Sequence, residues 1–190
     1  MSRVTRETEV HATIVIDGQG QANIATGVGF LDHMLDSLAR HGLFDLEVRA
    51  TGDLHVDDHH TVEDVGIALG QALRQALGDG RGIRRMGHAI VPLDEALALV
   101  SVDVSGRGFC DADIPLEGPT VGDLKVQMIP HFFLSLAMEA KITLHVQVLK
   151  GKNDHHKVEA CFKALAKALD WATQIDERAA DHIPSTKGVI

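Results

Sequence analysis

The sequence predicts an α/β fold of the α+β kind, made by internal duplication of a β-β-α-β-α unit, with two sheets and helices packed between them. The string Asp-His-His-x-Val-Glu occurs twice, beginning at Asp58 and Asp154, 96 positions apart. Each copy opens a long stretch with apolar residues at helical spacing, and similar shorter segments precede each copy. Units of about 90 residues bury little surface alone. We therefore expect one domain of two pseudo-repeats, about 1–85 and 86–180, with a C-terminal tail over 181–190.

The first half alternates between strand-like and helical patterns. Apolar residues alternate over 4–16 and 44–50, which is typical of half-buried strands. Asp17-Gly18 predicts a hairpin turn, with 21–26 returning as the partner strand. Helical spacing covers 30–38, where Gly42 is a plausible end, and the first His-His helix is expected over about 58–77.

The second half follows a similar order. Strand patterns cover 89–91 and 96–104, and the polar segment 105–122, rich in glycine and proline, is expected to be a loop. A helical segment at 129–136 and a strand at 142–149 then lead into the second His-His helix.

Composition excludes several classes of protein. The net charge of −9 argues against nucleic acid or an anionic membrane as the main partner. The N-terminal residues show no secretory signal, and no apolar run is long enough to span a membrane. Cys110 and Cys161 have no Cys-x-x-Cys spacing, which favours reduced thiols in a cytoplasmic protein.

The repeated motif predicts divalent metal ligands. Two imidazoles and one carboxylate lie in the first turn of each helix, beside a buried stripe that has the same phase in both copies. A single copy would more often be a polar helix start, but two copies in one register favour metal binding. Neighbouring histidines diverge by about 100° around a helix, so we expect them to serve different metals.

A further histidine in each half strengthens this prediction. His33 and His131 occupy matching positions, 26 and 24 residues before the respective His-His pairs. The expected ligands thus form two sets of three histidines and one glutamate, suited to Mn, Fe, Co, Ni or Zn. They are His33, His59, His60, Glu63, His131, His155, His156 and Glu159.

Basic residues suggest a phosphate-binding group. Arg107 follows a predicted strand, where loops often carry function. Lys163 lies four residues after Glu159, so a plain salt bridge explains it equally well. The tail Pro184-Ser185-Thr186-Lys187-Gly188 could bind phosphate or could be a disordered terminus.

Together these motifs resemble the imidazoleglycerol-phosphate dehydratase family of histidine biosynthesis, in its single-activity form. The resemblance covers essentially the whole chain. It rests on Gly29-Phe30-Leu31-Asp32-His33-Met34-Leu35, the doubled His-His-x-x-Glu, Val104-Ser105-Gly106-Arg107, His131-Phe132-Phe133 and the tail motif. One departure is Gly108, where many relatives are expected to have proline.

The resemblance implies a hydro-lyase with two Mn(II) ions per active site, although other divalent transition metals also fit. It implies a homo-oligomer of 24 subunits with active sites between subunits, and it maps the eight ligands above onto the metals. Implied substrate contacts are Glu7, His33, His41, His59, Glu63, Arg85, Arg107, His155, Lys163, Ser185 and Lys187.

The implied reaction is dehydration of D-erythro-imidazole glycerol 3-phosphate to imidazole acetol phosphate. Metal on the imidazole nitrogens would favour an imidazolate, which expels the adjacent hydroxyl to give a diazafulvene-like intermediate. A carboxylate, for which Glu7 is the candidate, would then remove a proton from the next carbon. A binuclear hydrolase and a metal-storage protein remain alternatives, and the basic residues argue against storage.

Overall fold

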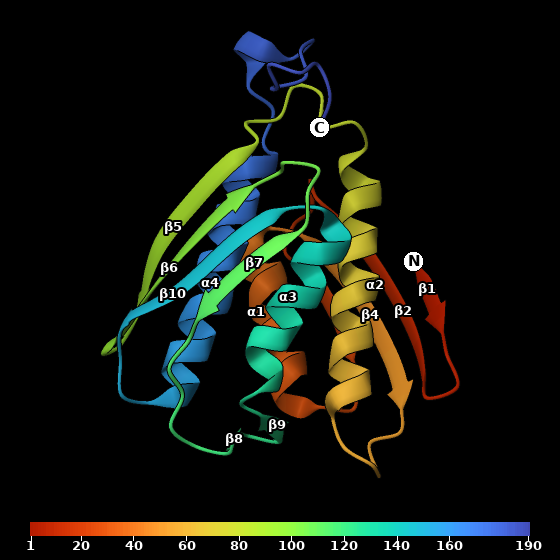
Figure 1. The fold of residues 1–190 in the computed structure, drawn as a ribbon, viewed down its shortest axis with the longest axis vertical. Coiled ribbons are helices and arrows are strands. Elements are labelled where there is room, and N and C mark those ends of the chain that lie inside the picture. The colour runs from red at the N-terminus through yellow and green to blue at the C-terminus, as the bar shows by residue number, and fades with distance from the viewer.

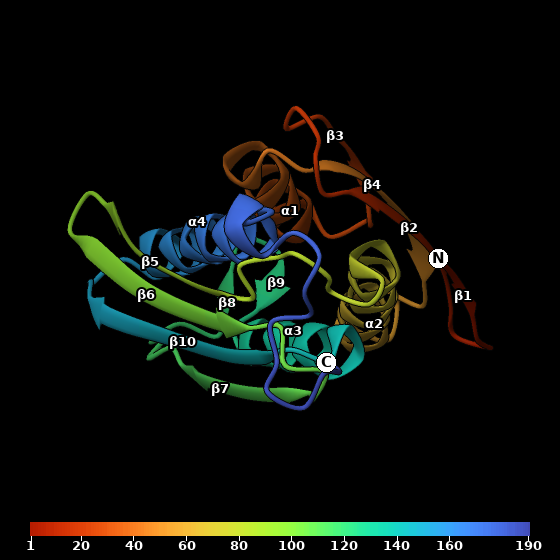
Figure 2. The same ribbon diagram turned by 90° about the horizontal axis from the view of Figure 1, so that it is seen from above.

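A computed structural model describes all 190 residues as two four-stranded mixed sheets with four helices packed between them. Figure 2 shows the helices as an inner layer, with β1–β4 on one side and β5, β6, β10 and β7 on the other. One cluster of 46 buried apolar residues runs through the helices and both inner sheet faces. The predicted fold class is confirmed.

The first sheet has the order β1-β2-β4-β3. Its central pair, β2 (Thr8–Val15) and β4 (Asp45–Gly52), is antiparallel, whereas β3 (Ala22–Ala25) runs parallel to β4. The short edge strand β1 (Ser2–Val4) pairs with β2. Val10 and Ala12 face the core while their neighbours are exposed, as the alternating pattern requires.

The second sheet has the corresponding order β5-β6-β10-β7. The strands β5 (Met86–Leu93), β6 (Ala96–Asp103) and β10 (Thr143–Lys150) are antiparallel neighbours. The edge strand β7 (Phe109–Asp113) is parallel to β10, as β3 is to β4. β5 begins directly after the expected repeat boundary, and the division of the chain at that boundary stays a prediction.

Three details of the sequence prediction are wrong. The chain turns after β2, but 21–26 does not form a hairpin with it, because β3 lies on the far side of β4. The Asp45 carboxylate accepts the N–H groups of Gln19 and Gln21 and so holds the connection across the end of β4.

The second error is in the segment 105–122, which contains β7 and β8 (Thr120–Val121) as well as loops. The predicted strand 4–16 is likewise divided into β1 and β2. Each four-stranded sheet therefore has one strand more than predicted, and the second half also contains a small two-stranded sheet. Each of these strands has at most five residues, so its local alternation is too brief to indicate it.

The helices are α1 (Gly29–Gly42), α2 (His59–Leu77), α3 (Met128–Ala140) and α4 (Asp154–Thr173). The apolar stripes behind both His-His motifs are buried, except that Ala76 is exposed. Glycine allows α2 to lie close to α3, since a Cβ at Gly70 would be 2.6 Å from the Leu136 carbonyl oxygen. None of the helices is both long and apolar enough to cross a membrane.

The four helices all begin at the same end of the molecule (Figure 1). The small hairpin of β8 and β9 (Leu124–Lys125) lies at this end and hydrogen-bonds to the starts of α1 and α2. The opposite end carries the short helix η1 (Glu177–Ala179) and the C-terminal tail. We call these the helix-start end and the tail end.

Candidate active site

All eight expected metal ligands lie in the first two turns of the four helices, at the helix-start end. The order of the elements explains this, since each helix that carries ligands follows a strand or hairpin that ends there. α1 and α3 contribute one histidine each, and α2 and α4 contribute two histidines and a glutamate each.

One group, which we call the His33 cluster, consists of His33, His155 and Glu159. Glu159 Oε2 lies 3.1 Å from His155 Nε2 and 3.5 Å from His33 Nε2. Phe30 packs its ring against His155 at a centroid distance of 5.1 Å. The cluster combines residues of both halves, because α1 contacts α4.

The second group, the His59 cluster, consists of His59, Glu63 and His131. Glu63 Oε1 lies 3.1 Å from His131 Nε2, and the rings of His59 and His131 are 5.0 Å apart between centroids. It too joins the halves, here through α2 and α3. In each cluster the three ligand atoms lie within 4.8 Å of one another, so two nitrogens and one carboxylate oxygen converge as a transition-metal site requires.

His60 and His156 belong to neither cluster. Nδ1 of His60 is 3.0 Å from an Asp53 oxygen, and Nδ1 of His156 is 2.7 Å from a Glu95 oxygen. These hydrogen bonds raise the pKa of both histidines. They also orient each ring so that Nε2 remains available, as a carboxylate does behind many metal-bound histidines.

No motif in the sequence indicates Asp53 and Glu95 as partners of these histidines. Asp53 follows β4 directly, and Glu95 lies in the tight turn between β5 and β6. Both positions look like ordinary turn residues, so only the folded arrangement identifies their role.

Three expected substrate residues lie near the ligands. Lys163 Nζ is 2.7 Å from Glu159 Oε1, so the simple salt bridge considered from spacing is present. Burial opposes the charge of Glu159, but Lys163 outweighs it and the pKa of Glu159 is lowered. Burial and the charges of Lys163 and Lys167 lower the pKa of His41. Glu7 is exposed, and its charge contributes to the raised pKa of His60.

The other four expected substrate residues lie at the tail end. Arg85 donates to both Asp103 oxygens and to the Pro184 carbonyl oxygen, which ties the tail to the start of β5. Arg107 is exposed in the loop after β6, and the Lys187 N–H donates to Ser185 Oγ. These residues are Arg85, Arg107, Ser185 and Lys187.

The tail end and the ligand clusters are far apart within one chain. Arg85 precedes β5 and Glu95, the partner of His156, follows it. Eight residues at about 3.3 Å each separate the two by roughly 25 Å. The chain thus does not bring its ligands and its exposed basic loop together.

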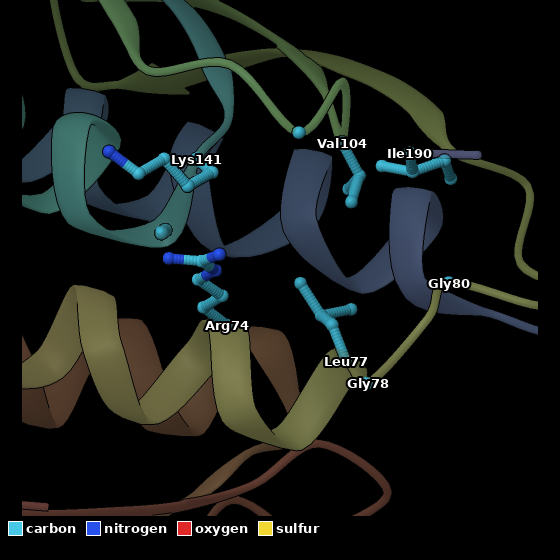
Figure 3. A pocket seen from close by; sticks show the side chains of 9 residues that line it. Arg74, Leu77, Gly78, Gly80, Val104, Lys141 and Ile190 are labelled. Atoms are coloured by element: carbon cyan, nitrogen blue, oxygen red, sulfur yellow. The ribbon is translucent and has the colours of Figure 1, made fainter.

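The tail end contains a cavity of about 120 Å³ next to the Arg107 loop (Figure 3). Figure 3 shows Arg74 rising from α2 toward Lys141 at the end of α3, with Val104 and Ile190 on the far side. Gly106 lines this cavity, but none of the expected substrate residues does.

The comparison with protein families decides the identification. The model of imidazoleglycerol-phosphate dehydratase matches residues 26–169, which include all eight expected ligands. The chain belongs to the imidazoleglycerol-phosphate dehydratase family. It is therefore a hydro-lyase of histidine biosynthesis.

Full-length relatives agree with the family match. The imidazoleglycerol-phosphate dehydratases of Roseiflexus sp. (strain RS-1) and Chloroflexus aurantiacus are 58% and 56% identical over 190 residues. Those alignments cover the whole chain and 96% and 93% of the respective relatives.

A solved structure of the family has the same fold. The Pyrococcus furiosus enzyme, crystallised in complex with (S)-C348, is 38% identical, with a TM-score of 0.86 and full coverage of both chains. The Staphylococcus aureus enzyme is 35% identical, with a TM-score of 0.82 over 93% of this chain and 98% of its own.

Proposed function

We propose that this enzyme dehydrates D-erythro-imidazole glycerol 3-phosphate to imidazole acetol phosphate with two Mn(II) ions per active site. The main support is the pair of His-His-Glu clusters, each assembled from both halves of the fold. Their nitrogen and oxygen donors, without thiolate, suit Mn(II) and neighbouring divalent transition metals. Family membership supplies the reaction.

The eight ligands divide into two roles in this proposal. The His33 and His59 clusters would each hold one metal, and His60 and His156 would complete the metal sites of neighbouring subunits. Each of these two histidines is exposed enough to reach outward, and each has its Nδ1 engaged by a carboxylate. That arrangement leaves Nε2 of each histidine free to bind a metal of a neighbouring subunit.

The distance between the two ends of the chain supports active sites between subunits. The substrate is a small ring on a three-carbon phosphate chain, far shorter than the roughly 25 Å that separates the ends of β5. Arg107, Ser185 and Lys187 of one chain would therefore bind the phosphate beside the ligands of another. In a homo-oligomer of 24 subunits, as the resemblance implies, the tail end of one subunit would lie against the helix-start end of another.

The protein residues have definable tasks in the reaction. Bound Mn(II) would supply Lewis acidity to the substrate imidazole and so favour the imidazolate and diazafulvene-like forms. The basic loop and tail would align the phosphate, which lowers the entropic barrier. Glu7, exposed beside His60, would remove the proton from the carbon next to the departing hydroxyl, and the resulting enol would become the ketone.

The cytoplasmic location also stays a proposal. It is in keeping with two free cysteines and with a reaction of amino-acid biosynthesis. With a net charge of −9, nucleic acid is not a partner in this proposal.

The test combines a substrate panel with metal counting. The purified protein should convert imidazole glycerol phosphate to a ketone, leave simple phosphate esters intact, and contain two Mn(II) per chain. Hydrolysis of the esters would instead support a binuclear hydrolase.

Native mass with and without EDTA tests the shared sites. Metal removal should reduce the mass, because ligands of different chains are no longer joined. A large assembly that stays intact after losing all of its metal would contradict this part of the proposal.

A further inference from the structure

The two halves differ most in the connection that leads into their first helix. In the first half, β3 is joined to α1 by three residues, Thr26 to Val28. In the second half, β7 and α3 are separated by residues 114–127, which contain β8 and β9. The extra segment has no counterpart in the first half, yet it lies at the helix-start end, where the ligands are (Figure 1).

This segment contacts the starts of three ligand-bearing helices, α1, α2 and α4, and leads directly into the fourth, α3. The Asp123 carboxylate accepts the N–H groups of Gly29 and Phe30, at 2.6 and 2.8 Å, and so caps α1. The Lys125 N–H donates to the Asp58 carboxylate, at 2.7 Å, directly before α2. The fourth ligand-bearing helix, α3, begins three residues after β9.

The contact with α4 involves the first residue of that helix. Asp154 Oδ2 accepts the N–H groups of Glu117 and Gly118, both at 2.9 Å. Lys157 Nζ joins Asp154 Oδ1 at 3.0 Å and the Pro115 carbonyl oxygen at 3.0 Å. Asp58 and Asp154 occupy the same position of the repeated motif, and both bind this one segment.

We infer that residues 115–125 form a clip that positions the two metal clusters relative to each other, with Asp123 as a positioning residue for the metal bound by His33. The inference rests on the proposed function, because it concerns the metals of that site. Each cluster takes ligands from both halves, so a small shift of one half against the other separates its ligand atoms. Metal sites tolerate only about 0.5 Å of such misplacement.

Asp123 is the most direct residue to test. The residue before α1, Val28, offers no capping side chain, so Asp123 supplies the acceptors for the two otherwise free N–H groups of Gly29 and Phe30. His33 is half exposed, and its position depends on the first turn of α1. Loss of this cap would let that turn fray and move His33 away from His155 and Glu159.

The experiment compares Asp123→Ala and Asp123→Asn with Asp45→Ala. Asp45 also accepts two backbone N–H groups, those of Gln19 and Gln21, but near the other end of α1, so it is a matched control. Each protein is titrated with Mn(II) after chelator treatment, and free Mn(II) is followed by electron paramagnetic resonance. Melting temperature and native mass are measured in parallel.

We expect Asp123→Ala to weaken one of the two Mn(II) sites by about tenfold or more, as for other residues that support metal ligands. Asp123→Asn keeps one acceptor oxygen and should give a smaller loss. Asp45→Ala should lower the melting temperature by a similar amount without changing either Mn(II) affinity.

Two results would overturn the inference that residues 115–125 position the metal clusters. In one, the wild type binds two Mn(II) and Asp123→Ala binds both equally well. In the other, Asp45→Ala weakens Mn(II) as much as Asp123→Ala does, which would reduce Asp123 to a general structural role. A wild-type protein that binds no Mn(II) would be a separate result, since it would overturn the proposed function itself.

Discussion

The two halves of the chain place equivalent histidines at equivalent helix starts but support them by different means. In the first half, a six-residue connection from β4 to α2 lets Asp53 reach His60. In the second half, only three residues join β10 to α4. That connection is too short to supply a carboxylate to His156. Glu95, from the turn between β5 and β6, hydrogen-bonds to His156 instead.

The variable position of the motif differs in the same way. Thr61 is fully buried in the first copy, whereas Lys157 in the second copy is buried with its ammonium on Asp154 and the Pro115 carbonyl oxygen. The comparison shows that the expected ligand residues are the same in the two halves while the residues behind them are not. Ligand chemistry restricts residue type strongly, but many acceptors can orient an imidazole.

The largest effects should come from removing the two different carboxylates. Asp53→Ala and Glu95→Ala should each lower Mn(II) affinity by about tenfold to a hundredfold, because the ring of His60 or His156 loses its orientation. Similar losses of affinity would show that the two carboxylates support their histidines equally. Mn(II) titration measures the effect, and Glu47→Ala, which removes an exposed carboxylate of β4 that pairs with Arg49, is the control. Unchanged affinity in either variant would mean that the carboxylate is dispensable in that half.

A second contrast concerns charge, because the exposed basic loop and tail belong to the second half and the C-terminal segment. Arg107→Ala and Lys187→Ala should weaken substrate binding by about tenfold to a hundredfold, since a charge-assisted contact contributes about 1.5–3 kcal/mol. Metal content should stay at the wild-type value. Steady-state kinetics and metal analysis separate the two effects, and equal loss of metal would place these residues in support of the ligands.

The binding of metal by the histidines should depend on pH. Imidazole must be neutral to bind metal, and its free pKa is about 6.5, so activity and metal content should fall together below about pH 6. The raised pKa of His60 and His156 favours their protonated forms, which extends this competition to higher pH. Excess Mn(II) should partly restore both quantities.

Removing a negatively charged ligand should move the loss of metal and activity to still higher pH. Glu63→Gln and Glu159→Gln each weaken the hold on the cation, so protons should displace it at higher pH than in the wild type. Metal analysis across pH 5–8, with activity measured on the same samples, checks this. If activity fell while metal stayed bound, the controlling group would be the acid/base, and Glu7 would be the first to replace.

The smallest effect should come from helix packing. Gly70→Ala would place a Cβ 2.6 Å from the Leu136 carbonyl oxygen and push α2 away from α3. The strain should exceed the helix preference of alanine and cost about 1–2 kcal/mol of unfolding free energy. Ala166→Gly, at the equivalent position of α4, measures helix preference without a clash. Denaturant unfolding compares them, and a more stable Gly70→Ala would contradict the close approach.

Several features of this protein could be determined from the sequence alone. The helices, the core strands β2, β4, β6 and β10, and the fold class follow from apolar periodicity, which is a local property of the chain. The equivalence of the two halves follows from the repeated Asp-His-His motif. The assignment of the eight ligands stays a prediction; it rests on the demand of metal chemistry for histidine and carboxylate at set spacings, and the structure brings six of the eight into two clusters.

Other features were decided only by the tertiary structure. β3 pairs with β4 rather than with β2, and β7 forms along β10, because sheet pairing depends on segments that are distant in sequence. The roles of Asp53, Glu95 and Asp123 likewise arise from contacts across 7, 61 and 93 or more positions. A carboxylate in a turn carries no local signal of its partner, since its partner is set by how the halves pack.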